Sequence, residues 1–280
     1  MTLKLIRAAV LGFAALLGAG AALAEEEEGS PEVSLAEAVP GHPGVTYEAL
    51  VKQVLPDLKP GAEGRWATDG VTLRKSEGEA EPSGPGELGS VDAFTYRAGG
   101  RDLMLIVIGD FAGQGWLHIV AVFDPAANGA PKLIDAVNVG IDRLTLTRSF
   151  LFLSPDETAL VFESSYPALE RVDSATQVVL LHEGKLKRVL LERTNQLMGC
   201  GLRVEQNPAL EVVEDGAAPY GAISYTVTQT VQAIDEDCAG LTAPDARPGT
   251  QTFTDVFHWD AATATYLTAT NNRAGLVTGR

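Results

Sequence analysis

The chain has 280 residues and a formal net charge of −16 at pH 7, with 45% hydrophobic and 21% charged residues. This acidity argues against nucleic acid as a partner, because phosphate binding needs patches of Lys and Arg, and it disfavours adsorption to anionic membranes. The length allows one large domain or two small ones.

The first 24 residues have the three regions of a secretory signal peptide. Lys4 and Arg7 give a positive start, an uncharged apolar run follows from Ala8, and Ala22-Leu23-Ala24 fits the A-x-A cleavage site. The alternative of a membrane anchor is disfavoured, because the run is short and no cluster of Lys or Arg follows it. We expect cleavage after Ala24, a periplasmic or secreted protein, and no stable membrane insertion once the signal is removed.

Residues 25–90 are expected to form an N-terminal arm with one helix and a flexible linker. Between Thr46 and Leu55 apolar residues recur at intervals of three and four, which predicts an amphipathic helix. Thr46 suits its N-cap, and Pro56 ends it. The stretch Ser76–Ser90 contains two Pro and four Gly and almost no large apolar residue, which is typical of a linker.

Residues 91–280 are expected to form an all-β domain around a central antiparallel pair. Two apolar runs, Leu103–Ile108 and Leu117–Phe123, flank the Gly-rich connection Gly109–Gly115, which is too short for a crossover helix. Other apolar runs predict strands at Lys132–Val139, Phe150–Leu153, Ala159–Phe162, Gln177–Leu181, Leu186–Glu192, Leu210–Val213, Ala222–Ile234, Thr250–Trp259 and Thr265–Thr270.

The spacing of these strands predicts the fold class. They follow one another closely, and Glu183-Gly184 marks a tight hairpin between two of them. No helical pattern separates them. We therefore predict a mainly β protein, an antiparallel sandwich or an open, propeller-like meander, with a short N-terminal helix.

The chain contains two cysteines, Cys200 and Cys238. In an oxidising compartment an even count predicts one disulfide. Two free thiols or half of a metal site are the alternatives, and no C-x-x-C spacing supports redox catalysis or zinc. We predict that Cys200 and Cys238 are joined.

Partial motifs for metal sites fail on their ligands. Asp110 opens a segment like a calcium loop, but Ala112 and Gln114 stand at ligand positions, so a glycine-rich turn is the better interpretation. His182-Glu183 begins like a zinc-protease motif, but Leu186 stands where the second His is required. Asp235-Glu236-Asp237 has the carboxylates for a loose divalent cation, and a solvated acidic loop is favoured. We predict no metal and no cofactor.

The basic residues gather in one place, at Lys185, Lys187, Arg188 and Arg193. Such a patch suits an acidic partner, but alternating cations also protect an exposed edge strand from aggregation. Protection of an edge is the favoured interpretation.

No catalytic residue is predicted, because the chain has no G-x-S-x-G elbow and its histidines have no ligand spacing. The preferred function is a non-catalytic binding or interaction module of the cell envelope, with an envelope protein or a small ligand as partner. The alternative is an envelope hydrolase with a site assembled from dispersed residues. Clustering of His118 or His258 with Asp110, Asp124 or Asp255 in one concave pocket would favour the hydrolase. The balance favours a protein that is not an enzyme.

Overall fold

The structure is a computed structural model that describes residues 32–61, 64–109, 112–113, 118–125, 129–140, 147–168, 171–199, 201–216, 218–234 and 247–277. The signal peptide, Asp110, both cysteines and Asp235-Glu236-Asp237 lie outside these ranges, so the predictions for them stay predictions.

The mainly β prediction is confirmed, with antiparallel sheets and one short α-helix, α1 (Tyr47–Val54), in the described part. The other elements are β1 (Lys59–Pro60), β2 (Trp66–Thr68), β3 (Thr72–Arg74), β4 (Ala80–Pro82), β5 (Gly86–Glu87), β6 (Ser90–Ala98), β7 (Arg101–Gly109), β8 (Ala112–Gly113), β9 (Ile119–Asp124), β10 (Lys132–Asn138), β11 (Thr147–Ser154), β12 (Glu157–Ala168), β13 (Arg171–His182), β14 (Lys185–Gly199), β15 (Leu202–Val213), β16 (Ala222–Ala233), β17 (Gly249–Asp260), β18 (Thr265–Leu267) and a short 3-10 helix, η2 (Asn272–Gly275). β10-β9-β7-β6 form one sheet, β11 to β18 form a large sheet in sequence order, and β1-β2-β5-β8 and β3-β4 form small ones.

The predicted helix is confirmed with its cap. The Thr46 hydroxyl accepts the N–H of Ala49 at 3.4 Å, and the helix ends two residues before Pro56. Its apolar stripe, which includes Leu50 and Val51, packs with Ile106 of β7 in the first hydrophobic core. Within the described residues, no helix has both the length and the apolar composition that crossing a membrane requires.

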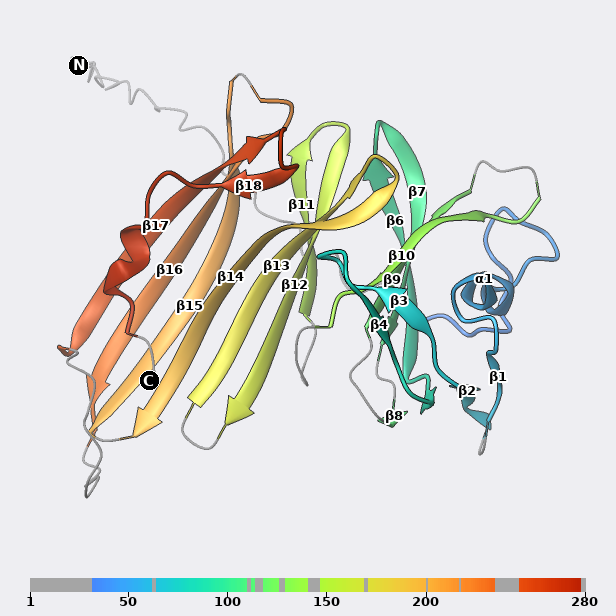
Figure 1. Cartoon of the computed structure of the whole chain (residues 1–280), viewed down its shortest axis with the longest axis horizontal. Helices are drawn as coiled ribbons and strands as arrows, with labels where there is room; N and C mark the ends of the chain where they lie inside the picture. Colours follow the sequence, from blue (N-terminus) through green and yellow to red (C-terminus); the bar gives the residue numbers. More distant parts are fainter. Residues whose placement is uncertain are drawn as a thin grey trace, which may run out of the picture.

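The central pair is confirmed as the middle of the four-stranded sheet. β7 and β9 are antiparallel, with Ile106 opposite Ala121. Because side chains alternate along a strand, Ile106 faces α1, while Leu105 and Val107 face the large sheet and form the second core with Phe162 of β12. Both faces of this pair are therefore buried, which explains its continuous apolar sequence. Figure 1 shows the four-stranded sheet between α1 and the large sheet.

The large sheet is an open meander in which each strand pairs with the next. The hairpin at Glu183-Gly184 is confirmed, and both residues have positive φ values, 51° and 73°, as a tight turn between β13 and β14 requires. One face of the large sheet packs on the four-stranded sheet, and we call the opposite face the inner face. The inner face carries the third core, which brings Leu180 of β13 together with Tyr225 of β16 and Phe257 of β17.

The meander folds over its own inner face because β14 and β15 pair only briefly. Their ladder has three register pairs, from Leu197 with Val204 to Gly199 with Leu202. Beyond these pairs the strands diverge, which allows β15–β17 to pack on β11–β13 across the third core. The Gly221 N–H donates to the Leu153 carbonyl at 2.8 Å and joins the two halves. The fold thus has a sandwich-like core inside an open meander.

The segment predicted as a linker carries ordered contacts. It contains β4 and β5, and Ser76 is buried, with its N–H on the carbonyl of Asn138 and its own carbonyl accepting the N–H of Arg188. These bonds attach the segment to both larger sheets. The division of the chain into an arm and a β-domain stays a prediction.

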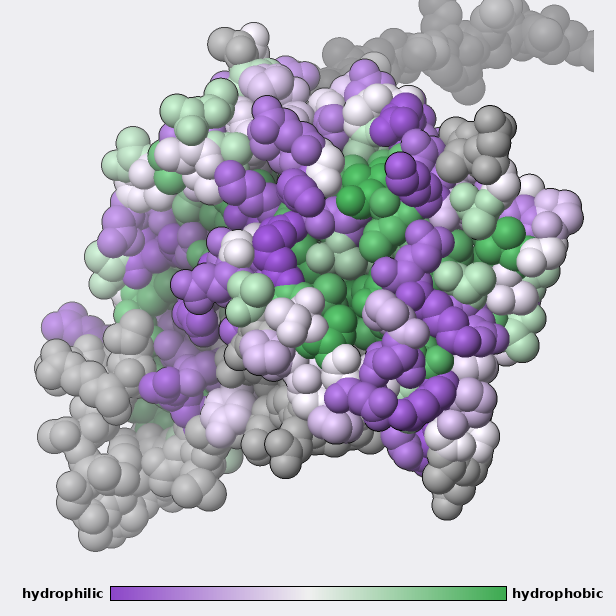
Figure 2. Space-filling view, turned by 45° about the vertical axis from the view of Figure 1, so that its right-hand side comes forward, coloured by the Kyte–Doolittle hydropathy of each residue, from purple (hydrophilic) through white to green (hydrophobic). Residues whose placement is uncertain are grey.

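Figure 2, in which the side with the four-stranded sheet comes forward, shows hydrophilic residues surrounding a patch of hydrophobic ones.

Candidate functional site

The polar centre of the large sheet is Asp255, whose side chain is fully buried on the inner face of β17. It pairs in register with Tyr225 and alternates with Phe253 and Phe257, so it lies on the same face as these rings. After β18, residues 268–277 turn back across this face. We call these residues the C-terminal segment.

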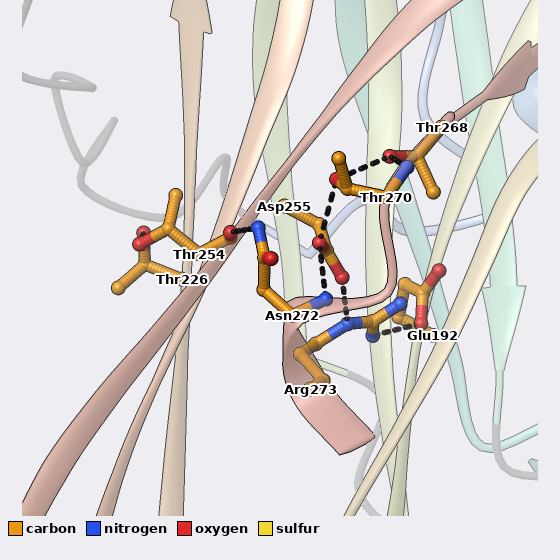
Figure 3. A network of polar contacts seen from close by, with 8 residues as sticks. All are labelled: Glu192, Thr226, Thr254, Asp255, Thr268, Thr270, Asn272 and Arg273. Carbon is orange, nitrogen blue, oxygen red and sulfur yellow. Dashed lines mark hydrogen bonds and ion pairs between the residues drawn. The ribbon is translucent and has the colours of Figure 1, made fainter. Parts of the chain in front are cut away.

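Three groups of the C-terminal segment donate to the Asp255 carboxylate (Figure 3). The Thr270 hydroxyl and the Asn272 N–H each donate to Oδ1 at 3.0 Å, and Arg273 Nε donates to Oδ2 at 2.7 Å. The Asn272 amide also donates to the Thr254 carbonyl at 2.9 Å. One carboxylate therefore fixes the path of three residues.

Arg273 joins the segment to a second strand of the sheet. Its guanidinium donates to Glu192 of β14 as well as to Asp255, and lies 5.2 Å from the Tyr225 ring centre and 5.6 Å from that of Phe257. We call Glu192, Asp255, Tyr225 and Phe257 the arginine socket. Glu192 lies on β14 and Asp255 on β17, so the two acids are on opposite sides of the place where β14 and β15 diverge. The guanidinium therefore connects the two halves of the large sheet.

The charges in the socket are held by hydrogen bonds. Burial alone would raise the pKa of Asp255, but the donors from Asn272, Arg273 and Thr270 outweigh it and hold the pKa below its usual value. Burial would lower the pKa of Arg273, but its hydrogen bonds to Glu192 and Asp255 raise it. Burial also raises the pKa of the Tyr225 phenol, to about 12. At neutral pH the socket is an ion pair over neutral rings.

Two buried glutamines bind the end of the segment through its backbone. Gln206 Nε2 donates to the Val277 carbonyl at 2.9 Å, and the Val277 N–H donates to Gln229 Oε1 at 2.8 Å. The glutamines also bond to each other at 2.9 Å. Between socket and glutamines, Gly275 lies against Phe253, and a Cβ there would stand 2.8 Å from the ring. The inner face thus contacts a cation, a residue without a side chain and a peptide group in succession.

A second polar cluster lies where the hairpin turns of the large sheet meet. In a meander alternate turns fall at the same end, and this brings together rings from β13, the β15–β16 connection and the β17–β18 pair. Trp259 packs edge to face on Tyr220, Tyr266 and His182, with ring centres 4.8, 5.4 and 5.5 Å apart. We call this group, with Glu157, the turn-end cluster.

Glu157 is the charged group of the turn-end cluster. Its Oε1 accepts the Gly99 N–H at 2.8 Å, while the buried Oε2 has no hydrogen-bond partner among the described residues. Burial raises the pKa of Glu157, the Gly99 hydrogen bond and His182 lower it in part, and Asp156 adds to the rise. A carboxyl whose pKa is raised by burial keeps its proton to higher pH than an exposed one, which is a property of general acids.

The predicted His–Asp pocket does not form among the described residues. His118 is buried just before β9 begins, and Asp124 lies at the other end of this strand, where it pairs with Arg101. His258 Nδ1 bonds Asp215 at 2.7 Å, but His258 lies three residues from Asp255 and so on the opposite face of β17. Asp110 lies outside the described residues.

The basic patch lies on a stretch of β14 that pairs with β13 but not with β15, whose ladder with β14 begins at Leu197. This stretch is therefore an edge on its β15 side, and its protection by the cations stays a prediction. Lys185 lies 3.7 Å from Asp135, Arg188 lies 3.3 Å from Glu77, and Lys187 donates to the carbonyl of Thr263. These three cations also attach β14 to neighbouring elements.

The cysteine pairing stays a prediction, since both cysteines lie outside the described residues. The chain next to each of them is adjacent in space. Leu202 pairs with Ala233, and the Ile234 N–H donates to the Gly201 carbonyl at 2.9 Å. This proximity is compatible with the predicted bond between Cys200 and Cys238.

Sequence reasoning did not single out Arg273, Glu192 or the two glutamines. Only Asp255 gave a usable signal, because an acid at an inner-facing position between Phe253 and Phe257 breaks the apolar alternation of its strand. A buried acid of this kind demands a cation or several donors. The residues that meet this demand come from the C-terminal segment, which reaches Asp255 through a chain reversal that no local pattern predicts.

In the part of the chain that the structure describes, no three His, Cys, Asp or Glu side chains gather so as to hold a metal ion. No family model, curated protein or solved structure matches the chain.

Proposed function

We propose that the chain is an exported, non-catalytic binding module of the cell envelope, and that it binds a short, irregular protein segment along the inner face of its large sheet. The observation that carries this proposal is the set of contacts to residues 268–277. The arginine socket, the Phe253 ring and the Gln206–Gln229 pair contact successive positions of an irregular segment, which is how a peptide groove recognises its ligand. Export rests on the signal-like first 24 residues.

A photo-crosslinking experiment tests the binding function. A photoreactive amino acid placed at Gln251, an exposed inner-face position of β17, should form adducts in intact cells. The same amino acid at Lys59, which is exposed on the far side of the fold, is the matched control. Adducts at Gln251 that mass spectrometry maps to one short segment of a partner protein, with none at Lys59, support the proposal. Equal labelling at both positions, or none at Gln251, contradicts it.

Export is tested separately by the intact mass of the protein recovered outside the cytoplasm. A chain that begins at Glu25 supports it. A retained Met1, or protein found only in the cytoplasm, contradicts it.

The second candidate function is a hydrolase, and the raised pKa of Glu157 beside His182 favours it. A general acid needs this kind of carboxyl. If the purified protein hydrolyses ester, glycoside or amide substrates and Glu157→Gln abolishes that activity, the hydrolase replaces the binding module.

A further inference from the structure

The arginine socket contains more negative charge than its occupant neutralises. Glu192 and Asp255 both contact Arg273. One guanidinium thus faces two carboxyl groups. If Arg273 leaves, two carboxylates remain over two aromatic rings, and this arrangement attracts a cation.

The geometry selects a guanidinium over an ammonium ion. Arg273 donates through Nε to one carboxylate and through Nη1 to the other, so the planar fork serves two acids at once. Its flat face lies over Tyr225 and Phe257. A lysine is a point charge with neither the fork nor the flat face.

We infer that the arginine socket is a guanidinium-binding site that Arg273 fills in cis, and that an arginine of a partner segment fills it in trans by displacing residues 268–277. This inference rests on the proposed function and names its ligand class. The partner is a segment with Arg, then Gly two positions later, then two apolar residues, and it forms the same short 3-10 turn as η2. Gly is required against Phe253, the first apolar residue enters the third core as Leu276 does, and the second presents its peptide group to the glutamines.

The way in which the segment is held makes exchange possible. Residues 268–277 contain one short helix, η2, with no side-chain cap, and most of their residues are exposed. Beyond β18 the segment adds no strand to the sheet. Side-chain contacts therefore hold it, and a partner segment of the same pattern offers the same contacts. The acidity of the whole chain also draws basic segments toward it.

Displacement is measured on the full wild-type chain by the side-chain Nε–H resonance of Arg273 in ¹⁵N-labelled protein. Arg273→Lys assigns this resonance. An unlabelled peptide of residues 271–277 should move it, with saturation, to the position of a free arginine. Peptides with Lys or Ala at the arginine position should bind at least tenfold more weakly. An unmoved resonance at saturating peptide, or equal affinity of the three peptides, overturns the inference.

Chemical rescue gives an independent test. The full chain with Arg273→Ala should gain thermal stability with added methylguanidinium, in a saturable way and more than with methylammonium. Arg65→Ala removes an exposed arginine paired with Glu87, and should show no such difference. Equal effects of the two cations on Arg273→Ala overturn the inference. Adducts at Gln251 combined with failure in both tests would leave the binding function standing and refute the guanidinium site alone.

Discussion

Two carboxyl groups on the inner face of the large sheet, Asp255 and Glu157, are desolvated and yet shift in opposite directions. Asp255 receives hydrogen bonds from three residues of the C-terminal segment, and its pKa falls. Glu157 receives one, from Gly99, and its pKa rises. The supply of donors, more than burial, therefore decides the charge of an acid in this fold.

The same contrast separates the way in which the C-terminal segment is held from the way in which the turn-end cluster is held. The C-terminal segment is fixed by an ion pair and by hydrogen bonds from side chains. The turn-end cluster is fixed by ring packing around Trp259, and among the described residues Glu157 Oε2 has no hydrogen-bond partner there. Removing Asp255 should therefore cost much unfolding free energy, and removing the charge of Glu157 should cost almost none.

The largest effect is expected for Asp255→Ala, which leaves Arg273 with one partner fewer in a buried site. Removing one member of a buried ion pair costs about 3–5 kcal/mol in unfolding free energy. Denaturant melts measure the loss. Asp69→Ala is the matched control, since its exposed pair with Lys59 should contribute no more than about 1 kcal/mol. Similar losses in the two variants would contradict the role of the socket.

A smaller loss is expected for Gly275→Ala. The new Cβ would meet the Phe253 ring at 2.8 Å, so the ring or the segment must shift, which costs about 1–3 kcal/mol. Gly216→Ala adds the same methyl group where nothing lies within 4 Å, and should change stability by less than about 0.5 kcal/mol. Thermal melts compare the two. A neutral Gly275→Ala would mean that the segment does not press on Phe253.

The smallest effect is expected for Glu157→Gln, which keeps an oxygen for Gly99 and removes the charge. Because the folded pKa of Glu157 is raised, its contribution to stability is complete below the unfolded pKa of 4.5 and is lost as pH rises through the folded value. Wild type should lose this contribution as pH rises from about 4.5 through the folded pKa, and Glu157→Gln should not. Melts across that range check the difference, and identical profiles would refute it.

The sequence was sufficient for the parts of the fold that depend on local patterns. The helix after Thr46, the central pair around Ile106 and the hairpin at Glu183 each follow from short-range signals, and each is confirmed. The arrangement of the sheets was less accessible. β14 carries alternating cations as an edge strand does, and Asp135 and Glu77, which come from other elements, contact two of them. Nothing local in the sequence indicates these partners.

The candidate site was mostly beyond reach of the sequence. Glu192, Asp255 and Arg273 come from distant parts of the chain and meet only because β14 and β15 diverge and residues 268–277 reverse direction. For the histidines and acids considered for a catalytic pocket, the structure was needed to show which of them share one face of a sheet. His258 and Asp255 are close in sequence and on opposite sides of one strand.

The most direct test of the contrast between the two acids is a carboxyl titration by ¹³C NMR, which follows Asp255 and Glu157 in one folded sample. The socket predicts a midpoint for Asp255 below its ordinary 3.8, and the turn-end cluster predicts a midpoint for Glu157 above its ordinary 4.5. By linkage, the stability due to Asp255 is complete above pH 3.8 and is lost as pH falls through its folded pKa. An Asp255 midpoint above 3.8, or a Glu157 midpoint below 4.5, would contradict the account.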